Sequence, residues 1–145
     1  MSLNHLNSQL AETSQMKEIV RKLNKLEKHY GRKERQKLLK KAAKPVVKRM
    51  KANLQPKRGT GLAKSTIKAM TFRKSPDVFV GPKKTGKKDP YYLFWYEFGA
   101  PANGQPARPF IRKTFNQMKK ATTALIQDLV SKSLKKYENR YAKRQ

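Results

Sequence analysis

Residues 91–112 read YYLFWYEFGAPANGQPARPFIR and join the most apolar run of the chain to its clearest turn signals. The run Tyr91–Phe98 is rich in aromatic side chains, which favour a pleated surface. We therefore expect it to form a central strand, with a helical turn as the alternative. Gly99 permits a backbone conformation closed to other residues, so the chain should bend sharply after the run. Pro109 suits the first position of a long final helix, because its missing N–H costs nothing there.

A single carboxylate, Glu97, lies near the end of this apolar run, where an unpaired charge would be costly. Two arginines, Arg108 and Arg112, follow the loop formed by residues 99–106. We predict that one of them pairs with Glu97, because a guanidinium group can satisfy both carboxylate oxygens. Phe110 should then tuck under the aromatic strand. The alternative is a Glu97 that is exposed at the end of the strand.

Two stretches ahead of this region have the apolar periodicity of helices. The first ends at Gly31, which resembles a helix C-cap, and predicts one broken helix or two short ones. The second covers residues 33–54 and has one apolar side that should be core, although Pro45 predicts a kink or a break in it. The apolar positions are Leu3, Leu6, Leu10, Ile19, Leu23, Leu26 and Tyr30 in the first stretch and Leu39, Ala43, Val46, Val47, Met50 and Leu54 in the second.

The middle of the chain is less regular. Residues 55–61 should form a turn, and residues 62–72 are compatible with either a helix or a strand. Residues 77–81 predict a strand because they include Val78, Phe79 and Val80. In the final helix, one apolar row is formed by Ile111, Phe115, Met118, Leu125 and Leu129, and the last dozen residues are expected to fray.

These elements predict an α+β fold, in which a small antiparallel sheet packs against a long C-terminal helix and a long N-terminal amphipathic helix. We expect an N-terminal helical segment over residues 1–31 and an α+β core over residues 32–131. Residues 132–145 should form a basic C-terminal tail.

The charge is strongly unbalanced, with 36 lysines and arginines, nine acids and a formal net charge of +27. Self-repulsion of this size destabilises an isolated compact monomer, so we expect an anionic partner. DNA is one candidate, because neutralising its phosphates releases counterions, and an acidic protein surface is another. The candidate contacts form a stripe on the second helix and part of the 81–90 loop, although a plain solvated face would explain both. They are Lys37, Lys40, Lys41, Lys44, Lys48, Lys51, Lys83, Lys84, Lys87 and Lys88.

Three stretches carry a family pattern. Ala42–Val47 and then residues 58–67 (RGTGLAKSTI) look like an amphipathic helix and a Thr-Gly-x-Leu-x-x-Ser-Ile turn. Tyr96–Ala100 is similar to a Glu-Phe-Gly-Thr signature, with alanine in place of threonine. Residues 107–112 are close to an Ala-Arg-Pro-Phe-Leu-Arg helix opening. In this order they resemble the tail-completion family of long-tailed bacteriophages, the gene-ten-like tail components of lambdoid phages, although this chain is more basic. The motif residues are Glu97, Phe98, Gly99, Arg108, Pro109 and Phe110.

The resemblance implies a structural virion protein that forms a homo-oligomeric ring, expected to be a hexamer, between the head connector and the tail tube. The implied partners are the connector or stopper protein, the tail tube or tail terminator protein, and the viral DNA that passes through the ring. The subunit would be assembled in the cytoplasm of the host bacterium and would end in the neck of the virion. The resemblance implies no cofactor, metal or membrane.

Catalysis is not expected from this sequence. Only His5 and His29 could act as general bases, and both lie in the polar N-terminal region. Nuclease chemistry needs clustered carboxylates that hold Mg²⁺ near a phosphate. Ser75-Pro76-Asp77 resembles the start of one nuclease pattern, but no downstream acid has the lysine that the pattern requires two places later. A phosphate-binding loop of the P-loop type is also missing.

Other classes are weaker. The chain has no cysteine, which excludes disulfides and thiolate metal sites. It has no signal-peptide pattern, and its longest apolar run is too short to cross a bilayer, so we expect a soluble protein. The alternative function is a free-standing basic nucleic-acid-binding protein. Against it, the aromatic residues cluster instead of alternating with basic ones, as a stacking platform would require.

Overall fold

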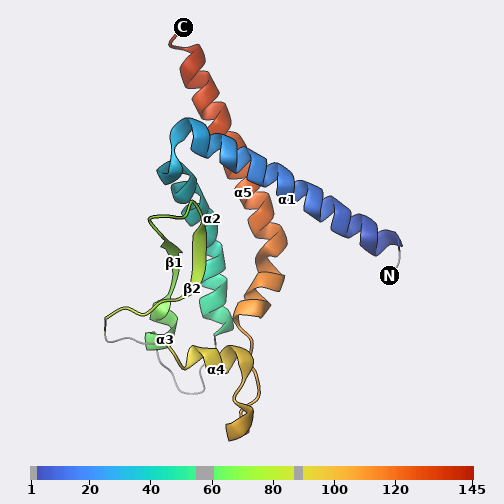
Figure 1. Ribbon diagram of the computed structural model, residues 1–145, viewed down its shortest axis with the longest axis vertical. Helices are drawn as coiled ribbons and strands as arrows, with labels where there is room; N and C mark the ends of the chain where they lie inside the picture. Colours follow the sequence, from blue (N-terminus) through green and yellow to red (C-terminus); the bar gives the residue numbers. More distant parts are fainter. Residues whose placement is uncertain (1–2, 55–60, 87–89) are drawn as a thin grey trace.

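The computed structural model describes residues 3–54, 61–86 and 90–145, and within them it confirms the α+β class. Three long helices form the frame, and a two-stranded sheet lies beside the second of them (Figure 1). In chain order the elements are α1 (Leu3–Tyr30), α2 (Arg32–Asn53), α3 (Gly61–Thr66), β1 (Ile67–Thr71), β2 (Val78–Pro82), α4 (Leu93–Phe98), the 3-10 helix η1 (Pro101–Asn103) and α5 (Ile111–Ala142).

The first two helices differ from expectation in their continuity. α1 is one unbroken helix, and it ends before Gly31, whose positive φ of 91° turns the chain into α2. α2 in turn runs through Pro45 as one helix, so of the two predicted alternatives, a kink or a break, the break is wrong. Core positions lie on both sides of the proline, including Ala43 and Met50, and their burial offsets the lost backbone hydrogen bond.

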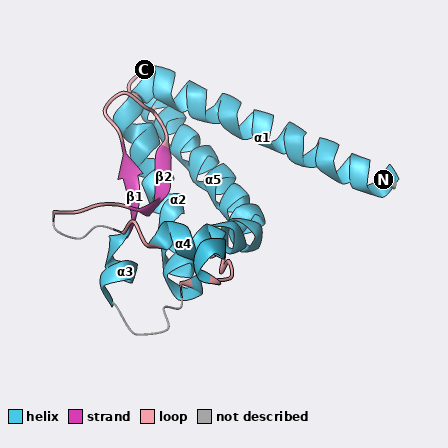
Figure 2. Cartoon of the chain, turned by 60° about the horizontal axis from the view of Figure 1, so that its bottom comes forward, coloured by secondary structure: helices cyan, strands magenta, loops and turns pink. Residues whose placement is uncertain are grey.

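The sheet is a single antiparallel pair whose register runs from Ile67 opposite Pro82 to Thr71 opposite Val78. The predicted strand over residues 77–81 is therefore confirmed. The ambiguous stretch 62–72 divides into a helical turn, α3, and the strand β1. The sheet packs against α2 (Figure 2). Its other face carries exposed aromatic side chains, among them Phe79.

Two hydrophobic clusters form the core, and α2 and α5 contribute to both. The first lies between α2, the sheet, α4 and the start of α5. The second lies where α1 crosses α5, and it contains Val130, which is fully buried although it lies outside the predicted apolar row. The first consists of Met50, Leu54, Ala63, Ile67, Leu93 and Phe110, and the second of Ile19, Leu23, Leu26, Leu38 and Val130.

At the edge of the second cluster, Tyr30 stacks on Tyr137 with ring centroids 3.6 Å apart. The Tyr137 hydroxyl donates to Glu34 Oε2 at 3.1 Å. Burial, followed by this hydrogen bond, raises the pKa of Tyr137 above its ordinary value. The hydroxyl therefore stays a neutral donor that ties α5 to α2.

The last helix is longer than expected. It begins at Ile111 with Phe110 as its N-cap, so the prediction that Pro109 is its first residue is wrong. It continues to Ala142, so most of the segment expected to fray is helical. Its apolar row is only partly covered within one chain: Met118, Leu125 and Leu129 are half-buried, but Phe115 is 66% exposed. No helix among the described residues is both long and apolar enough to cross a bilayer.

The main correction concerns residues 91–98, which form helix α4 and not the central strand. Leu93 and Glu97, four residues apart, face inward, whereas Phe94 and Phe98 face outward. This spacing is that of a helix. The stretch therefore presents two different faces, one apolar and acidic toward the core and one aromatic toward solvent.

Candidate assembly site

The centre of the site is the Glu97 carboxylate, which is only 3% exposed and binds the first turn of α5. Its Oε2 accepts hydrogen bonds from the backbone N–H groups of Phe110 (2.9 Å) and Ile111 (2.8 Å), and its Oε1 accepts one from that of Arg112 (3.1 Å). The first N–H groups of a helix have no partner within the helix, and its N-terminus favours negative charge. Glu97 therefore caps α5 from a different helix. We call this arrangement the Glu97 latch.

The predicted ion pair is made by Arg112. Its Nε lies 3.1 Å from Glu97 Oε1, and one of its terminal nitrogens donates to the Glu97 backbone carbonyl at 2.8 Å. Arg108 does not join this pair. Its backbone N–H donates to the Tyr96 carbonyl at 2.7 Å, and its exposed side chain lines an open cleft of about 820 Å³ that Lys113 also lines. The bond to Tyr96 is a second link across the latch.

Gly99 ends α4 in a conformation that suits only glycine, with φ 79° and ψ 170°. A Cβ built there would lie 2.8 Å from the Ala107 backbone nitrogen, so the returning chain occupies the space of a side chain. Between them the loop closes on itself, because Ala100 and Gln105 exchange two backbone hydrogen bonds of 2.9 and 3.1 Å. Phe110, as predicted, is buried, at 1% exposure, in the core cluster that contains Leu93 of α4 and Ile67 of β1. The aromatic segment beside it is helix α4 and not the predicted strand.

The latch holds an exposed group of aromatic side chains, which we call the α4 patch: Tyr91, Phe94, Trp95 and Phe98. Their exposed fractions are 71%, 58%, 48% and 57%. The ring of Phe94 contacts those of Trp95 (5.4 Å between centroids) and Phe98 (4.9 Å), and the Arg112 guanidinium lies 5.7 Å from the Phe98 ring. Contiguous exposed aromatic surface on a rigid support is typical of protein-binding sites.

The lysine stripe of α2 lies on the surface of the protein. Lys37, Lys40, Lys41, Lys44 and Lys48 are exposed, while Lys51 is half-buried. Lys83 and Lys84 are exposed after β2, and Lys87 and Lys88 lie outside the described residues. Most of the predicted stripe is therefore exposed to solvent.

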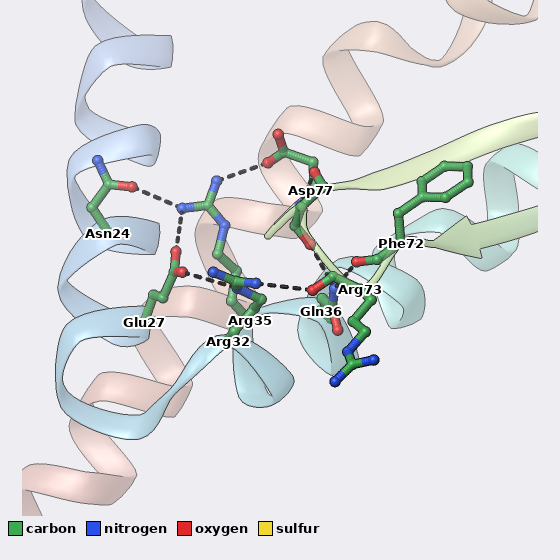
Figure 3. Close-up of polar contacts among 9 residues, drawn as sticks. Asn24, Glu27, Arg32, Arg35, Gln36, Phe72, Arg73 and Asp77 are labelled. Atoms are coloured by element: carbon green, nitrogen blue, oxygen red, sulfur yellow. Dashed lines mark hydrogen bonds and ion pairs between the residues drawn. The ribbon is translucent and has the colours of Figure 1, made fainter.

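A polar junction that the sequence analysis did not identify centres on Arg35, which is 7% exposed (Figure 3). The guanidinium donates to Asn24 Oδ1 (2.7 Å), Glu27 Oε2 (3.2 Å) and Asp77 Oδ1 (2.9 Å). Next to it, Gln36 donates to the Ser75 carbonyl at 2.7 Å. Side chains of α2 thus hold both the end of α1 and the turn between β1 and β2. The partners lie eight to 42 residues from Arg35 in the sequence, so no local sequence pattern predicts them.

Within residues 3–54, 61–86 and 90–145, no group of three or more histidine or acidic side chains is placed to bind a metal ion. His29 is exposed, near the end of α1, and contacts the Tyr30 ring. Nothing is described for the side chain of His5.

The chain was compared with curated proteins, with solved structures and with models of protein families. No curated protein and no solved structure matches the chain. A family model described as "Bacteriophage HK97-gp10, putative tail-component" matches residues 17–99, which is more than half of the chain and extends from α1 to the glycine of the latch. The chain therefore belongs to the HK97-gp10-like family of bacteriophage tail components.

Proposed function

We propose that this chain is a structural subunit of the neck of a tailed phage, a tail-completion or head–tail connector protein. Copies form a ring, expected to be hexameric, between the connector and the tail tube. Membership of a phage tail-component family supports a virion protein with an assembly role and not a catalytic one. The observation that carries the finer proposal is the α4 patch, which presents four exposed aromatic residues on a support fixed by a buried carboxylate.

The patch has the properties of a docking surface. Trp and Tyr are enriched among the residues that dominate binding energy, and each loses little conformational entropy when it is covered. The latch fixes the orientation of α4 before binding, which lowers the ordering cost of association. A connector or tail terminator protein with a complementary apolar pocket would therefore cover the patch when the neck assembles.

The lysine stripe supports a ring that lets DNA pass. Five exposed lysines on one helix produce a strong local positive potential, and viral DNA would neutralise it during passage. In the proposed ring, this side of α2 faces the channel or an acidic partner, and the α4 patch faces a protein.

The patch can be tested with a matched pair of double variants. Phe94→Ser with Trp95→Ser should leave the fold intact, because both side chains are about half exposed, but should lower head–tail joining at least tenfold. The measurement is the yield of joined particles when purified protein is added to a lysate of the phage lacking this gene. Electron microscopy of the purified protein reports ring formation in parallel.

The control is Phe72→Ser with Phe79→Ser. These two rings also contact each other edge to face, with centroids 5.3 Å apart, and are 52% and 48% exposed, but they lie by the sheet. This variant should join heads and tails as the unaltered chain does. Joining that is unaffected by the loss of Phe94 and Trp95 would exclude the patch as the docking surface.

A second candidate function, free-standing nucleic-acid binding, is favoured by the lysine stripe alone. A variant with Lys40→Gln, Lys44→Gln and Lys48→Gln should bind duplex DNA more weakly. The negative slope of log affinity against log salt concentration should become shallower by about three. The control variant replaces the exposed Lys135, Lys136 and Lys143 of the C-terminal end with glutamine.

The two triple variants carry the same net charge, so only the position of the lost charge differs. Equal slopes for both would show that DNA responds to total charge and not to the stripe. Loss of DNA binding with head–tail joining intact would separate the nucleic-acid role from the neck role.

A further inference from the structure

The N-terminal part of α1 extends away from the rest of the molecule (Figures 1 and 2). We call residues 3–14 the arm. Directly after it, α1 contacts α5: Gln15 donates to Gln127 at 3.2 Å, and Thr123 lies 4.0 Å from the Met16 sulfur. Leu3 and Leu10 of the arm are 78% and 67% exposed. The arm therefore carries apolar side chains that its own molecule does not cover.

The geometry of α1 explains why they stay uncovered. Leu3 and Leu10 are seven residues apart and share one side of the helix at about 100° per residue. Ile19 is nine residues beyond Leu10, which places it on about the opposite side, and it is buried in the second core cluster. Because α1 is a single helix, the packing of Ile19 turns the leucines away from the body. Only another molecule can cover them.

The arm also differs from the rest of the chain in charge. All 36 lysines and arginines follow residue 16, and the arm contains one carboxylate, Glu12. Two copies of a chain with a net charge of +27 repel each other wherever their basic surfaces meet. The arm is the segment that a second copy can accept without this repulsion.

A groove of about 680 Å³ beside the arm offers a matching surface. Its lining includes the apolar Val46, Phe115, Met118 and Ile126 and the cationic Lys119 and Lys120. The chain's own α1 also lines it, through Glu12, Gln15 and Met16. Phe115 and Ile126 lie about 16 Å apart along α5, and the two arm leucines span about 10 Å, so the groove is long enough for them.

We propose that the arm of one copy packs into this groove on a second copy. Leu3 and Leu10 then cover Phe115 and Met118 of the neighbour. The arm lies before residue 17, where the family match begins, so this contact is an addition to the shared part of the family fold. It links copies whether or not they form the proposed neck ring.

The test uses cysteines, since the chain has none of its own. Full-length Leu10→Cys and Met118→Cys, carrying tags of different mass, are mixed and mildly oxidised. We expect disulfide-linked heterodimers at least ten times as abundant as in a mixture of Leu10→Cys and Phe79→Cys, because Phe79 is exposed but lies on the outer face of the sheet. Equal yields in the two mixtures would overturn the proposal.

Sedimentation equilibrium gives an independent readout of the same contact. Leu3→Ser with Leu10→Ser should weaken self-association about ten- to a hundredfold, whereas Phe79→Ser should leave it unchanged. A wild-type chain that stays monomeric at every concentration, or an arm variant that associates as wild type does, would refute the arm contact. Either result leaves the α4 patch and its joining assay untouched, so the two proposals fail separately.

Discussion

Gly99→Ala should destabilise the chain by about 3–4 kcal/mol, which is a large effect for the addition of one methyl group. Two causes act together. The φ of 79° with ψ of 170° belongs to a region that residues other than glycine avoid, and the new Cβ would lie 2.8 Å from the Ala107 backbone nitrogen. The backbone cannot retreat easily, because Arg108 is bonded to the Tyr96 carbonyl. Urea unfolding followed by circular dichroism measures the loss.

Gly104→Ala is the matched control. Gly104 also has a positive φ, 67°, but its ψ of 18° places it in the left-handed helical region, and a Cβ there would meet no atom within 4 Å. Gly104→Ala should lower the free energy of unfolding by about 1 kcal/mol. If the two alanine variants were equally stable, the close approach of the chain at Gly99 would have no energetic weight.

Gly99 also shows where sequence reasoning succeeded and where it did not. Three predictions from the residues of this region are confirmed. The chain bends at Gly99, Phe110 is buried, and Glu97 pairs with an arginine that follows the loop. The strand assigned to residues 91–98 was wrong, because a short apolar run has no period that separates strand from helix. The strand was predicted because aromatic residues have a high β-propensity, but that propensity depends strongly on context.

A helix signal was nevertheless present in that run. Leu93 and Glu97 are four residues apart, as are Phe94 and Phe98, and a glycine follows directly, as it does after many helices. Gly99 donates its N–H to the Trp95 carbonyl at 2.8 Å, which completes the last helical turn. The same glycine can therefore end a helix or bend a strand, and only the packing of Leu93 in the core distinguishes the two.

The Arg35 junction could not have been predicted in the same way. Its partners come from α1 and from the turn before β2, and their choice depends on how three elements meet. In a chain with 36 basic residues and nine acids, a given acid has many possible partners in the sequence. Burial selects Arg35 from among them, because a guanidinium can satisfy several acceptors at once.

Glu97→Gln is expected to cost about 3 kcal/mol, nearly as much as the change at Gly99. The carboxylate accepts three backbone N–H groups and the Arg112 Nε through two oxygens. In glutamine one oxygen becomes an NH₂ group, which is a donor and would face donors. At least one buried N–H at the start of α5 then loses its partner, and the favourable charge at the helix N-terminus is lost as well.

Two further variants separate the causes in the same unfolding assay. Glu138→Gln, at an exposed site with Lys25 4.0 Å away, should change stability by about 0.5 kcal/mol or less. Arg112→Gln should cost about 1 kcal/mol, because the arginine side chain is 58% exposed and the three backbone bonds to Glu97 remain. The latch is therefore principally a capped helix and secondarily an ion pair. An Arg112 variant as unstable as the Glu97 variant would reverse that order. The ion pair predicted from the sequence would then be the main source of the latch's stability.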